Sequence, residues 1–345
     1  MPYQLGLPFE DLGEARRVGR SVESSPAARG SASPGACVLM SEVLNRRNLH
    51  EALKRVKQNQ GSAGIDGMKV GELSEHLRWN WPRIREDLLR GRYRPQPVKR
   101  QEIPKAGGGP RQLGIPTVLD RFVQQALLQV LQPRIDPSFS QHSYGFRPGR
   151  RAHDAVREAQ RYIQGGRRWV VDVDLERFFD RVNHDVLLER LSRRIPDKSV
   201  LGLIRRYLEA GILVNGVKVD RHEGTPQGGP LSPLLANVLL DEVDQELEQR
   251  GHTFVRYADD CNVYVRSKRA GERVLAWLRR AFAALKLRVN ASKSAVDLAH
   301  RRTFLGFSFW YGPGGAVKRR LSPKAKHVMK TRVRQITRRT RGRSL

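Results

Sequence analysis

Residues 254–266 read FVRYADDCNVYVR, two apolar stretches joined by a short acidic turn. The apolar residues on both sides predict two strands of one hairpin, which hold Asp259 and Asp260 at its tip against a rigid sheet. As an isolated tetrapeptide, YADD would more often be an ordinary polar turn. A second β-branched stretch, WVVDVD at residues 169–174, also ends in carboxylates. If the two strand regions lie side by side, Asp174 and Asp259 converge on one point.

Several carboxylates this close predict a site for divalent cations, because their charges repel one another strongly unless cations lie between them. Hard oxygen ligands favour Mg²⁺, which also binds substrate phosphates. Two such ions about 4 Å apart would support in-line displacement at a phosphorus centre. One ion would activate a primer 3′ hydroxyl, and the other would stabilise the pyrophosphate leaving group. The expected metal ligands, which are also the expected catalytic residues, are Asp174, Asp259 and Asp260.

A glycine-rich stretch, GTPQGGPLSPLLAN at residues 224–237, carries the second signal. Ser232 followed by Pro233 is typical of a helix start, so the stretch can be read as a loop before a core helix. A plain turn, however, would not need Gly228 and Gly229 together with a neighbouring glutamine. Paired glycines permit close approach of the backbone to a ligand, and a base pair or a nucleotide would fit there.

The composition is that of a folded, strongly basic protein, with 39% hydrophobic residues, 29% charged residues and a formal net charge of +29. So large an excess repels itself unless a polyanion neutralises it, which favours a nucleic-acid partner. A basic protein on an anionic membrane and a ribosomal-type structural protein are the alternatives. No apolar run approaches the roughly 20 residues of a membrane span, so no membrane insertion is expected. The two cysteines exclude a disulfide framework and fit a reducing, cytoplasmic compartment of bacterial type.

The predicted elements follow the order of an α+β protein, with a small antiparallel sheet backed by helices in a split βαβ arrangement. Residues 1–40 contain few large apolar groups and are expected to form a disordered leader. A helix is expected from Ser41 to about Asn59, and the last strand of the sheet is expected at residues 304–310. From Leu298 onward there is no acidic residue. This basic tail is read either as solvated and partly disordered or as a helical nucleic-acid contact.

Three stretches, in this order, resemble the motifs of group II intron-encoded reverse transcriptases: VDVDLERFFDRVNHD (171–185), GTPQGGPLSPLLANVLLDEVD (224–244) and RYADDCNVYV (256–265). Two earlier stretches resemble the fingers motifs of that family: IPKAGGGPRQLGIPTVLDRFVQQAL (103–127) and HSYGFRPGRRAHDAV (142–156). ALKRVKQNQGSAGIDG (52–67) resembles its N-terminal extension. Several motifs at compatible spacing are far more specific than a lone YADD.

The resemblance implies a right-hand polymerase fold with fingers and a palm. Residues 41–97 would form the N-terminal extension and part of the fingers, and residues 98–312 the fingers and palm. Residues 313–345 would be the basic start of a thumb or maturase region that is mostly missing.

The resemblance also implies roles for single residues. Asp174, Asp259 and Asp260 match the catalytic aspartates, and Asp172 does not. Phe179, five positions after Asp174, matches the aromatic residue that selects deoxynucleotides by clashing with a 2′ hydroxyl. The other residues expected to bind the nucleotide are Lys105, Arg111, Gln227, Gly228 and Lys293. The residues expected at the template or primer are Arg147, Arg150, Phe304, Leu305 and Gly306.

The implied function is RNA-directed DNA synthesis for a group II intron retroelement. Deoxynucleotides would be added to a DNA primer on an RNA template, in the first place the intron RNA, and assistance of intron splicing would be a further activity. Two alternatives stay open: a catalytically idle RNA-binding maturase remnant, and a domesticated or defence-associated reverse transcriptase. The three intact aspartates argue against the idle remnant, and QGGPLSPLLAN favours the intron type. The sequence indicates no particular oligomeric state.

Overall fold

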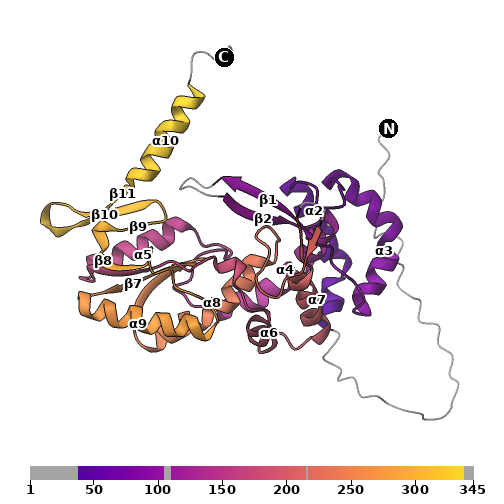
Figure 1. Cartoon of the computed structure of the whole chain (residues 1–345), viewed down its shortest axis with the longest axis horizontal. Helices are drawn as coiled ribbons and strands as arrows, with labels where there is room; N and C mark the ends of the chain where they lie inside the picture. The colour runs from indigo at the N-terminus through magenta and orange to yellow at the C-terminus, as the bar shows by residue number, and fades with distance from the viewer. Residues whose placement is uncertain (1–37, 105–109, 215–216, 338–345) are drawn as a thin grey trace, which may run out of the picture. The chain divides into compact units, whose positions relative to one another are not determined.

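The computed structural model describes residues 38–104, 110–214 and 217–337 (Figure 1). Lys105 and residues 1–37 of the expected leader therefore lie outside the described residues. The chain divides into two compact units, each made of two separate segments. The first unit runs to Ser138 and resumes from Phe179 to Val238, and the second comprises Phe139–Phe178 and the chain from Leu239 onward.

The first unit is mainly helical. Its helices are α1 (Val38–Val43), α2 (Arg46–Asn59), α3 (Leu73–Leu89), α4 (Val118–Ile135), α6 (His184–Ser192) and α7 (Lys198–Glu209), with short 3-10 turns η1 (Val70–Glu72) and η2 (Asp136–Ser138). The expected single helix from Ser41 to Asn59 is wrong, because Asn45 interrupts it. The Asn45 side chain accepts a hydrogen bond from the Arg47 backbone nitrogen at 2.9 Å and so caps α2, a common way to begin a helix.

The first unit also holds a four-stranded sheet with the order β2-β1-β4-β5. The strands are β1 (Val98–Pro104), β2 (Pro110–Ile115), β4 (Ile212–Val214) and β5 (Val217–Val219). β1 and β2 form an antiparallel pair, whereas β1 and β4 run parallel. This arrangement places Arg111, on β2, in the same sheet as the short hairpin β4–β5, which the sequence did not predict.

The second unit is built around an antiparallel sheet with the order β6-β7-β3-β8. Its strands are β3 (Trp169–Val173), β6 (Thr253–Tyr257), β7 (Asp260–Val265) and β8 (Ala295–Leu298). Helix α5 (Ala152–Gln164) packs on the face that carries Val170, Val255 and Tyr264. Helix α9 (Lys268–Ala284) lies against the opposite face, where Gly271 approaches Val171 and Val296 closely. Helices thus cover both faces of this antiparallel sheet.

Helix α8 (Ser232–Gln249) begins at Ser232, as the sequence predicted. The prediction for the last strand of the sheet is wrong, because the fourth strand is β8. Residues 304–310 instead contribute to a separate three-stranded sheet, in which Leu305 and Gly306 form a turn with φ values of 49° and 82°. The strands of that sheet are β9 (Thr303–Phe304), β10 (Phe307–Tyr311) and β11 (Val317–Leu321).

The chain continues from β11 into α10 (Pro323–Ile336), which Ser322 caps by accepting a hydrogen bond from the Ala325 backbone nitrogen at 3.2 Å. The basic tail is therefore helical over these residues. The remaining short 3-10 turns are η3 (Phe178–Asp180), η4 (Ala299–Arg301) and η5 (Pro313–Gly315). None of the helices among the described residues is long and apolar enough to span a membrane.

Candidate active site

The β6–β7 hairpin carries Asp259 and Asp260 at its tip. Tyr257 pairs with Asp260 across the hairpin, so Ala258 and Asp259 form a two-residue turn. Ala258 has a φ of 58°, a left-handed conformation that costs a residue with a side chain roughly 1–2 kcal/mol. The turn therefore depends on contacts that hold it in this shape.

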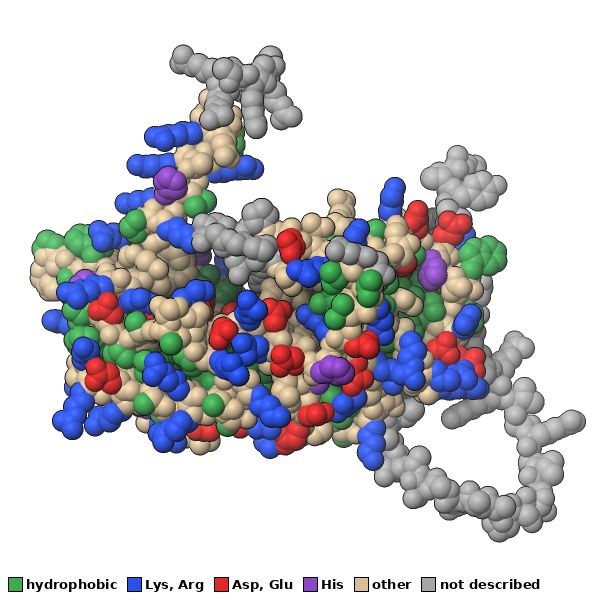
Figure 2. Space-filling model, viewed as in Figure 1, with side chains coloured by type: hydrophobic (Ala, Val, Ile, Leu, Met, Phe, Trp, Pro, Cys, Tyr) green, Lys and Arg blue, Asp and Glu red, His purple; other side chains and the backbone are tan. Residues whose placement is uncertain are grey.

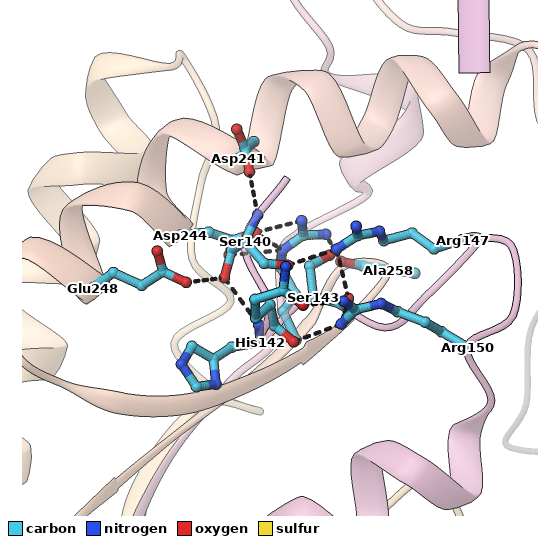
Figure 3. A network of polar contacts seen from close by, with 11 residues as sticks. Ser140, His142, Ser143, Arg147, Arg150, Asp241, Asp244, Glu248 and Ala258 are labelled. Carbon is cyan, nitrogen blue, oxygen red and sulfur yellow. Dashed lines mark hydrogen bonds and ion pairs between the residues drawn. The ribbon is translucent and has the colours of Figure 1, made fainter. Parts of the chain in front are cut away.

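Arg256, on the strand that leads into the turn, supplies the first of these contacts. Its Nη1 donates to the Ala258 carbonyl oxygen at 2.9 Å. The same guanidinium forms an ion pair with Asp244 of α8, with 2.5 Å between Nη2 and Oδ2, and both side chains are buried. Figure 3 shows Asp244 and Ala258 in this network. Removing one partner of a buried ion pair typically costs about 3–5 kcal/mol, because the other charge is left unpaired. The pair thus fixes the turn to α8.

A segment that precedes α5, residues 139–150, supports the hairpin along β6. The backbone nitrogen of Arg256 donates to the His142 carbonyl oxygen at 2.9 Å, and the backbone nitrogen of Tyr144 donates to the Arg256 carbonyl oxygen at 2.8 Å. Between them, Ser143 forms a parallel bridge with Arg256. Residues 142–144 therefore run alongside β6, next to the acidic tip of the hairpin.

Gly145 follows this edge and packs directly against the turn. A Cβ atom at this position would lie 2.1 Å from the Ala258 backbone nitrogen, closer than side chains approach in proteins. The start of the segment is tied to α8 by Ser140, whose backbone nitrogen donates to Asp241 at 3.1 Å and whose Oγ donates to Glu248 at 2.5 Å (Figure 3). The acidic turn is thus held by backbone packing on one side and by α8 on the other.

Asp174 directly follows β3 and lies at the same end of the sheet as the acidic hairpin tip. In the β3–β7 register Asp172 lies opposite Asn262 and Val173 lies opposite Cys261, so the next position, Asp174, comes opposite Asp260. Directly opposed residues in antiparallel strands have Cα atoms about 4.5–5.5 Å apart. The two acidic strand regions therefore lie side by side, the condition for the predicted convergence of their carboxylates.

The electrostatics of this edge are those of crowded carboxylates. The side chain of Asp260 reaches the surface, yet partial burial and the repulsion from Asp259, Asp172 and Asp174 raise the pKa of Asp260 to about 7. The ammonium of Lys293 lies 3.7 Å from the Oδ2 of Asp174 and offsets part of the negative charge. Among the residues that the structure describes, no three His, Cys, Asp and Glu side chains are arranged to hold a metal ion. The donor chemistry nevertheless suits Mg²⁺, because hard carboxylate oxygens are its preferred ligands and a cation relieves their repulsion.

Asp172 is close to these carboxylates but has other partners. Arg302 donates Nε and Nη2 to its Oδ2 at 2.9 and 2.6 Å. The Asn262 amide, with its nitrogen turned towards Asp172, donates to Oδ1 at 3.0 Å. Burial raises the pKa of Asp172, and the hydrogen bonds and charge of Arg302 oppose that rise. Both oxygens of Asp172 are used within the protein, which favours Asp174 as the residue that binds a cation.

Comparison with known protein families identifies the chain. The family described as "Reverse transcriptase (RNA-dependent DNA polymerase)" matches residues 103–309, which include the hairpin, Asp174 and the glycine-rich stretch. The chain belongs to the reverse transcriptase family. Members of this family generally use divalent metal ions, in keeping with the carboxylates at the sheet edge.

Among curated proteins, the chain is 38% identical over 208 residues to Protein YkfC of Escherichia coli (strain K12), which covers 59% of the chain and 55% of that relative. It is 40% identical over 175 residues to the group II intron-encoded protein LtrA of Lactococcus lactis subsp. cremoris, over 50% of the chain and 29% of that relative. It is 30% identical over 177 residues to nuclear intron maturase 2, mitochondrial, of Arabidopsis thaliana, over 40% of the chain and 24% of that relative. The predicted relation to group II intron reverse transcriptases and maturases is confirmed.

Among solved structures, telomerase from Candida albicans, in complex with the TWJ fragment of telomeric RNA, matches with a TM-score of 0.52 and 13% identity. The match covers 67% of this chain and 46% of the telomerase chain. At this identity the likeness concerns the fold alone, and the predicted α+β fingers and palm fold is confirmed. The chain spans about half or less of the length of the curated relatives that it matches.

Three of the expected nucleotide-binding residues, Arg111, Gln227 and Gly228, lie at or beside β2 in the first unit. Arg111 is on β2, and Gly114 of the same strand donates its backbone nitrogen to the Gln227 carbonyl oxygen at 2.9 Å. Gly228 has a φ of 135°, and a Cβ there would lie 2.8 Å from the Gly114 carbonyl oxygen. The backbone at Gln227 and Gly228 therefore lies directly against β2, a close approach that the glycine at position 228 permits.

Phe179 lies next to the same glycine-rich stretch. Its carbonyl oxygen accepts a hydrogen bond from the Thr225 backbone nitrogen at 2.7 Å, and its side chain is buried, with 8% exposed. The glycine-rich stretch is therefore hydrogen-bonded to the backbone of η3. The role of Phe179 in sugar selection stays a prediction.

The arginines expected at the template fall into two cases. Arg147 is buried, and its Nη1 donates to the carbonyl oxygens of Ser140 and Ser143 at 2.6 and 3.1 Å. This geometry gives Arg147 a structural role within residues 139–150 and does not support a contact with template phosphates. Arg150 is half-buried and donates to the carbonyl oxygen of Gln141 at 2.5 Å, so its phosphate contact stays a prediction.

The predicted primer-end hairpin is present as β9, a turn and β10. Phe304 is buried in the hydrophobic core of the second unit. Leu305 and Gly306 form the turn, and the Gly306 carbonyl oxygen accepts a hydrogen bond from the Ser322 backbone nitrogen at 2.9 Å, just before α10. Contact of this turn with a primer remains a prediction.

Sequence reasoning missed Arg256 and Asp244, which support the acidic turn. A signal was available, because Arg256 follows buried Phe254 at the two-residue spacing of a strand and so shares its face. A charged residue on a buried face calls for a partner of opposite charge. The partner itself, on a helix that precedes the strand, could not be chosen among the several acids of that helix without the fold.

Proposed function

We propose that this chain is the RNA-directed DNA polymerase of a group II intron retroelement, which adds dNTPs to a primer 3′ hydroxyl on an RNA template. The observation that carries the proposal is that the hairpin tip with Asp259 and Asp260 lies beside the end of β3, which Asp174 follows directly. Partial burial and the repulsion from Asp259, Asp172 and Asp174 raise the pKa of Asp260 to about 7, and the buried Arg256–Asp244 ion pair holds the turn. Strongly perturbed carboxylates in such a setting are typical of functional sites.

In this proposal Asp174, Asp259 and Asp260 hold two Mg²⁺ ions. When bound, the ions supply charge stabilisation for the attacking hydroxyl and for the pyrophosphate leaving group. The chain itself does the positioning: the β3–β7 register sets Asp174 opposite Asp260, and the packing around Ala258 sets Asp259. The ammonium of Lys293, whose side chain is 65% exposed, lies at the edge of the cluster, where it is suited to bind triphosphate oxygens.

Primer extension tests the proposed function. The purified chain is mixed with an RNA template, an annealed DNA primer, the four dNTPs and Mg²⁺, and the product is sequenced. We expect DNA complementary to the RNA, and we expect EDTA to stop its synthesis. A chain that binds the primer–template but extends no primer at any Mg²⁺ concentration would contradict the proposal.

The proposed partners are an RNA template, in the first place the intron RNA, together with a DNA primer and dNTPs. The net charge of +29 supports a polyanionic partner. Figure 2 shows Lys and Arg side chains over much of the visible face and along the helix that ends the described chain. The relation to intron-encoded proteins supports intron RNA as the template.

The affinity for RNA is expected to fall steeply with salt. Each phosphate that a Lys or Arg side chain neutralises should contribute about 0.9 to the slope of log affinity against log salt on a duplex, and about 0.7 on a single strand. A filter-binding titration from about 50 to 200 mM salt measures that slope. A slope near zero would show that the excess positive charge does not bind phosphates.

Replacing Phe179 with valine is expected to relax discrimination against ribonucleotides by about tenfold, because one well-packed contact in a pocket is worth roughly 1–3 kcal/mol of specificity. The measurement is incorporation of rNTPs relative to dNTPs on an RNA template. Phe178→Val is the matched control, since Phe178 is also buried and its loss should lower stability without changing the choice of sugar. Equal selectivity in the wild type and the Phe179 variant would rule out the steric role.

Assistance of intron RNA splicing is a second candidate activity. It is favoured by the likeness to proteins named nuclear intron maturases. Splicing help depends on RNA binding rather than on the carboxylates, so Asp259→Asn should abolish primer extension and leave any stimulation of splicing intact. A self-splicing assay of intron RNA with and without the protein measures it, and no stimulation by the wild type would exclude this activity.

A further inference from the structure

A second charged network lies on the other face of the palm sheet from the Arg256–Asp244 pair. Cys261 pairs with Arg256 and Asn262 with Asp172, and neighbouring residues of one strand point to opposite faces. Neither Asp172 nor its partner Arg302 has a part in the mechanism given above. The network adjoins the acidic cluster, because Asp172 precedes Asp174 by two positions.

Arg302 is the centre of this network and joins two parts of the chain. Its Nε and Nη2 donate to Asp172 Oδ2 on β3 at 2.9 and 2.6 Å. Its Nη2 also donates to the backbone carbonyl oxygen of Lys293 at 2.8 Å. A guanidinium is suited to this task, since its planar fork carries several donors in fixed directions. The Lys293 backbone is thus fastened to the strand that carries Asp174.

The segment around Lys293 is further wrapped around Asp174. The backbone nitrogen of Asn290 donates to the Asp174 carbonyl oxygen at 2.8 Å, and the Ser294 backbone nitrogen donates to the Asn290 carbonyl oxygen at 2.9 Å. The Asp174 backbone nitrogen donates to Ser294 Oγ at 3.0 Å. The hydrogen bonds of Asn290 and Ser294 lie on either side of Lys293 in the sequence. The Lys293 carbonyl oxygen between them accepts the hydrogen bond from Arg302. The ammonium of Lys293 ends 3.7 Å from Asp174 Oδ2.

We propose that Arg302 is a positioning residue for the incoming nucleotide: by joining Asp172 to the Lys293 carbonyl, it holds the Lys293 ammonium beside Asp174, where the triphosphate would arrive. This inference rests on the proposed polymerase function. A lysine has a long, flexible side chain, so the place of its backbone limits where the ammonium can reach. When the Lys293 backbone is released, the ammonium spends less time at the site, and the nucleotide binds more weakly.

A purely structural role predicts a different result. Arg302 also compensates the half-buried charge of Asp172, so its removal should lower the stability of the fold. Loss of stability alone reduces the amount of active protein and therefore kcat, and it leaves KM for the nucleotide unchanged. A positioning role raises KM for dNTP and changes kcat little.

The experiment compares Arg302→Gln, Arg302→Lys and the control Arg301→Gln in steady-state dNTP incorporation well below the unfolding temperature. Arg301 is the adjacent arginine, 64% exposed, and its guanidinium lies 3.9 Å from Asp297. We expect Arg302→Gln to raise KM for dNTP by about five- to tenfold with kcat within about twofold of the wild type. Arg302→Lys should recover part of the loss, and Arg301→Gln should match the wild type. A fall in kcat at constant KM, or the same KM in both glutamine variants, would overturn the proposal.

Hydrogen exchange gives a readout that needs no catalysis. The backbone amides of Asn290 and Ser294 are hydrogen-bonded in this segment and should exchange faster in Arg302→Gln than in Arg301→Gln, while those of β7 stay protected. Equal exchange in the two variants would overturn the proposal. If the wild type extends no primer, the proposed function fails, and this measurement alone then decides whether Arg302 positions the Lys293 segment.

Discussion

Replacing Asp259 with asparagine is expected to abolish primer extension, with a rate loss on the order of 10³ or more, about 4 kcal/mol of transition-state stabilisation. Asp259 lies on the two-residue turn that Arg256 and Gly145 hold against the palm. An asparagine fits the same turn, so the fold should survive. It carries no charge and binds a hard cation poorly, so the cluster loses a ligand. The measurement is single-turnover extension of a labelled primer on an RNA template, with circular dichroism and RNA binding as checks on the fold.

The control for this prediction is Asp297→Asn, on β8 of the same sheet. Asp297 is partly exposed, lies 3.9 Å from Arg301 and has no place in the acidic cluster, so its variant should keep wild-type activity. Asp174→Asn should be as inactive as Asp259→Asn, whereas Asp172→Asn should keep most of its kcat. An essential Asp172 with a dispensable Asp174 would show that the ligands are assigned to the wrong positions of β3.

Replacing Gly145 with alanine is expected to reduce primer extension by a factor on the order of 10², since a shift of about 1 Å in a catalytic group can cost that much. The new Cβ would lie 2.1 Å from the Ala258 backbone nitrogen and 2.8 Å from the Tyr257 carbonyl carbon. Both are backbone atoms, so no flexible side chain can yield, and the turn that carries Asp259 must move. Overpacking of this kind also lowers the free energy of unfolding by about 1–3 kcal/mol.

Gly165→Ala in the same unit is the matched control. A Cβ at Gly165 meets its nearest neighbours at 3.5 Å, an ordinary van der Waals distance, and its φ is −75°. Both variants should be compared by thermal unfolding and by primer extension at a temperature where each is folded. Wild-type activity in Gly145→Ala would show that the support beneath the hairpin does not set the position of Asp259.

The strands that build the site could be predicted from sequence because each carries its own pattern. FVRYADDCNVYVR holds two apolar stretches around an acidic turn, and WVVDVD is a short β-branched strand. The pairing of these two strand regions, which brings Asp174 opposite Asp260, could not be predicted from the sequence. Strand pairing depends on contacts between distant parts of the chain. Helix α8 begins at Ser232 because serine followed by proline is a local start signal.

The elements that sequence reasoning missed lack such local patterns. β8 has only four residues, all half-buried, so AVDL shows neither clear alternation nor a continuous apolar run. The family resemblance implied a template contact for Arg147, and nothing in the neighbouring sequence indicates that its guanidinium is buried against backbone carbonyls. Arg302 and Asp172 are 130 positions apart, and no spacing rule links residues at such separation.

The most direct test of the central claim is the insertion of a single nucleotide opposite a defined base of an RNA template. A DNA primer ends just before a template uridine, and each dNTP is offered alone with Mg²⁺ to the wild-type chain and to Asp259→Asn. The account predicts that the wild type adds dATP, adds the other three dNTPs poorly and adds nothing after EDTA, and that Asp259→Asn adds none. Addition that ignores the template base, or no addition by a wild type that binds the primer–template, would contradict the assignment of this chain as an RNA-directed DNA polymerase.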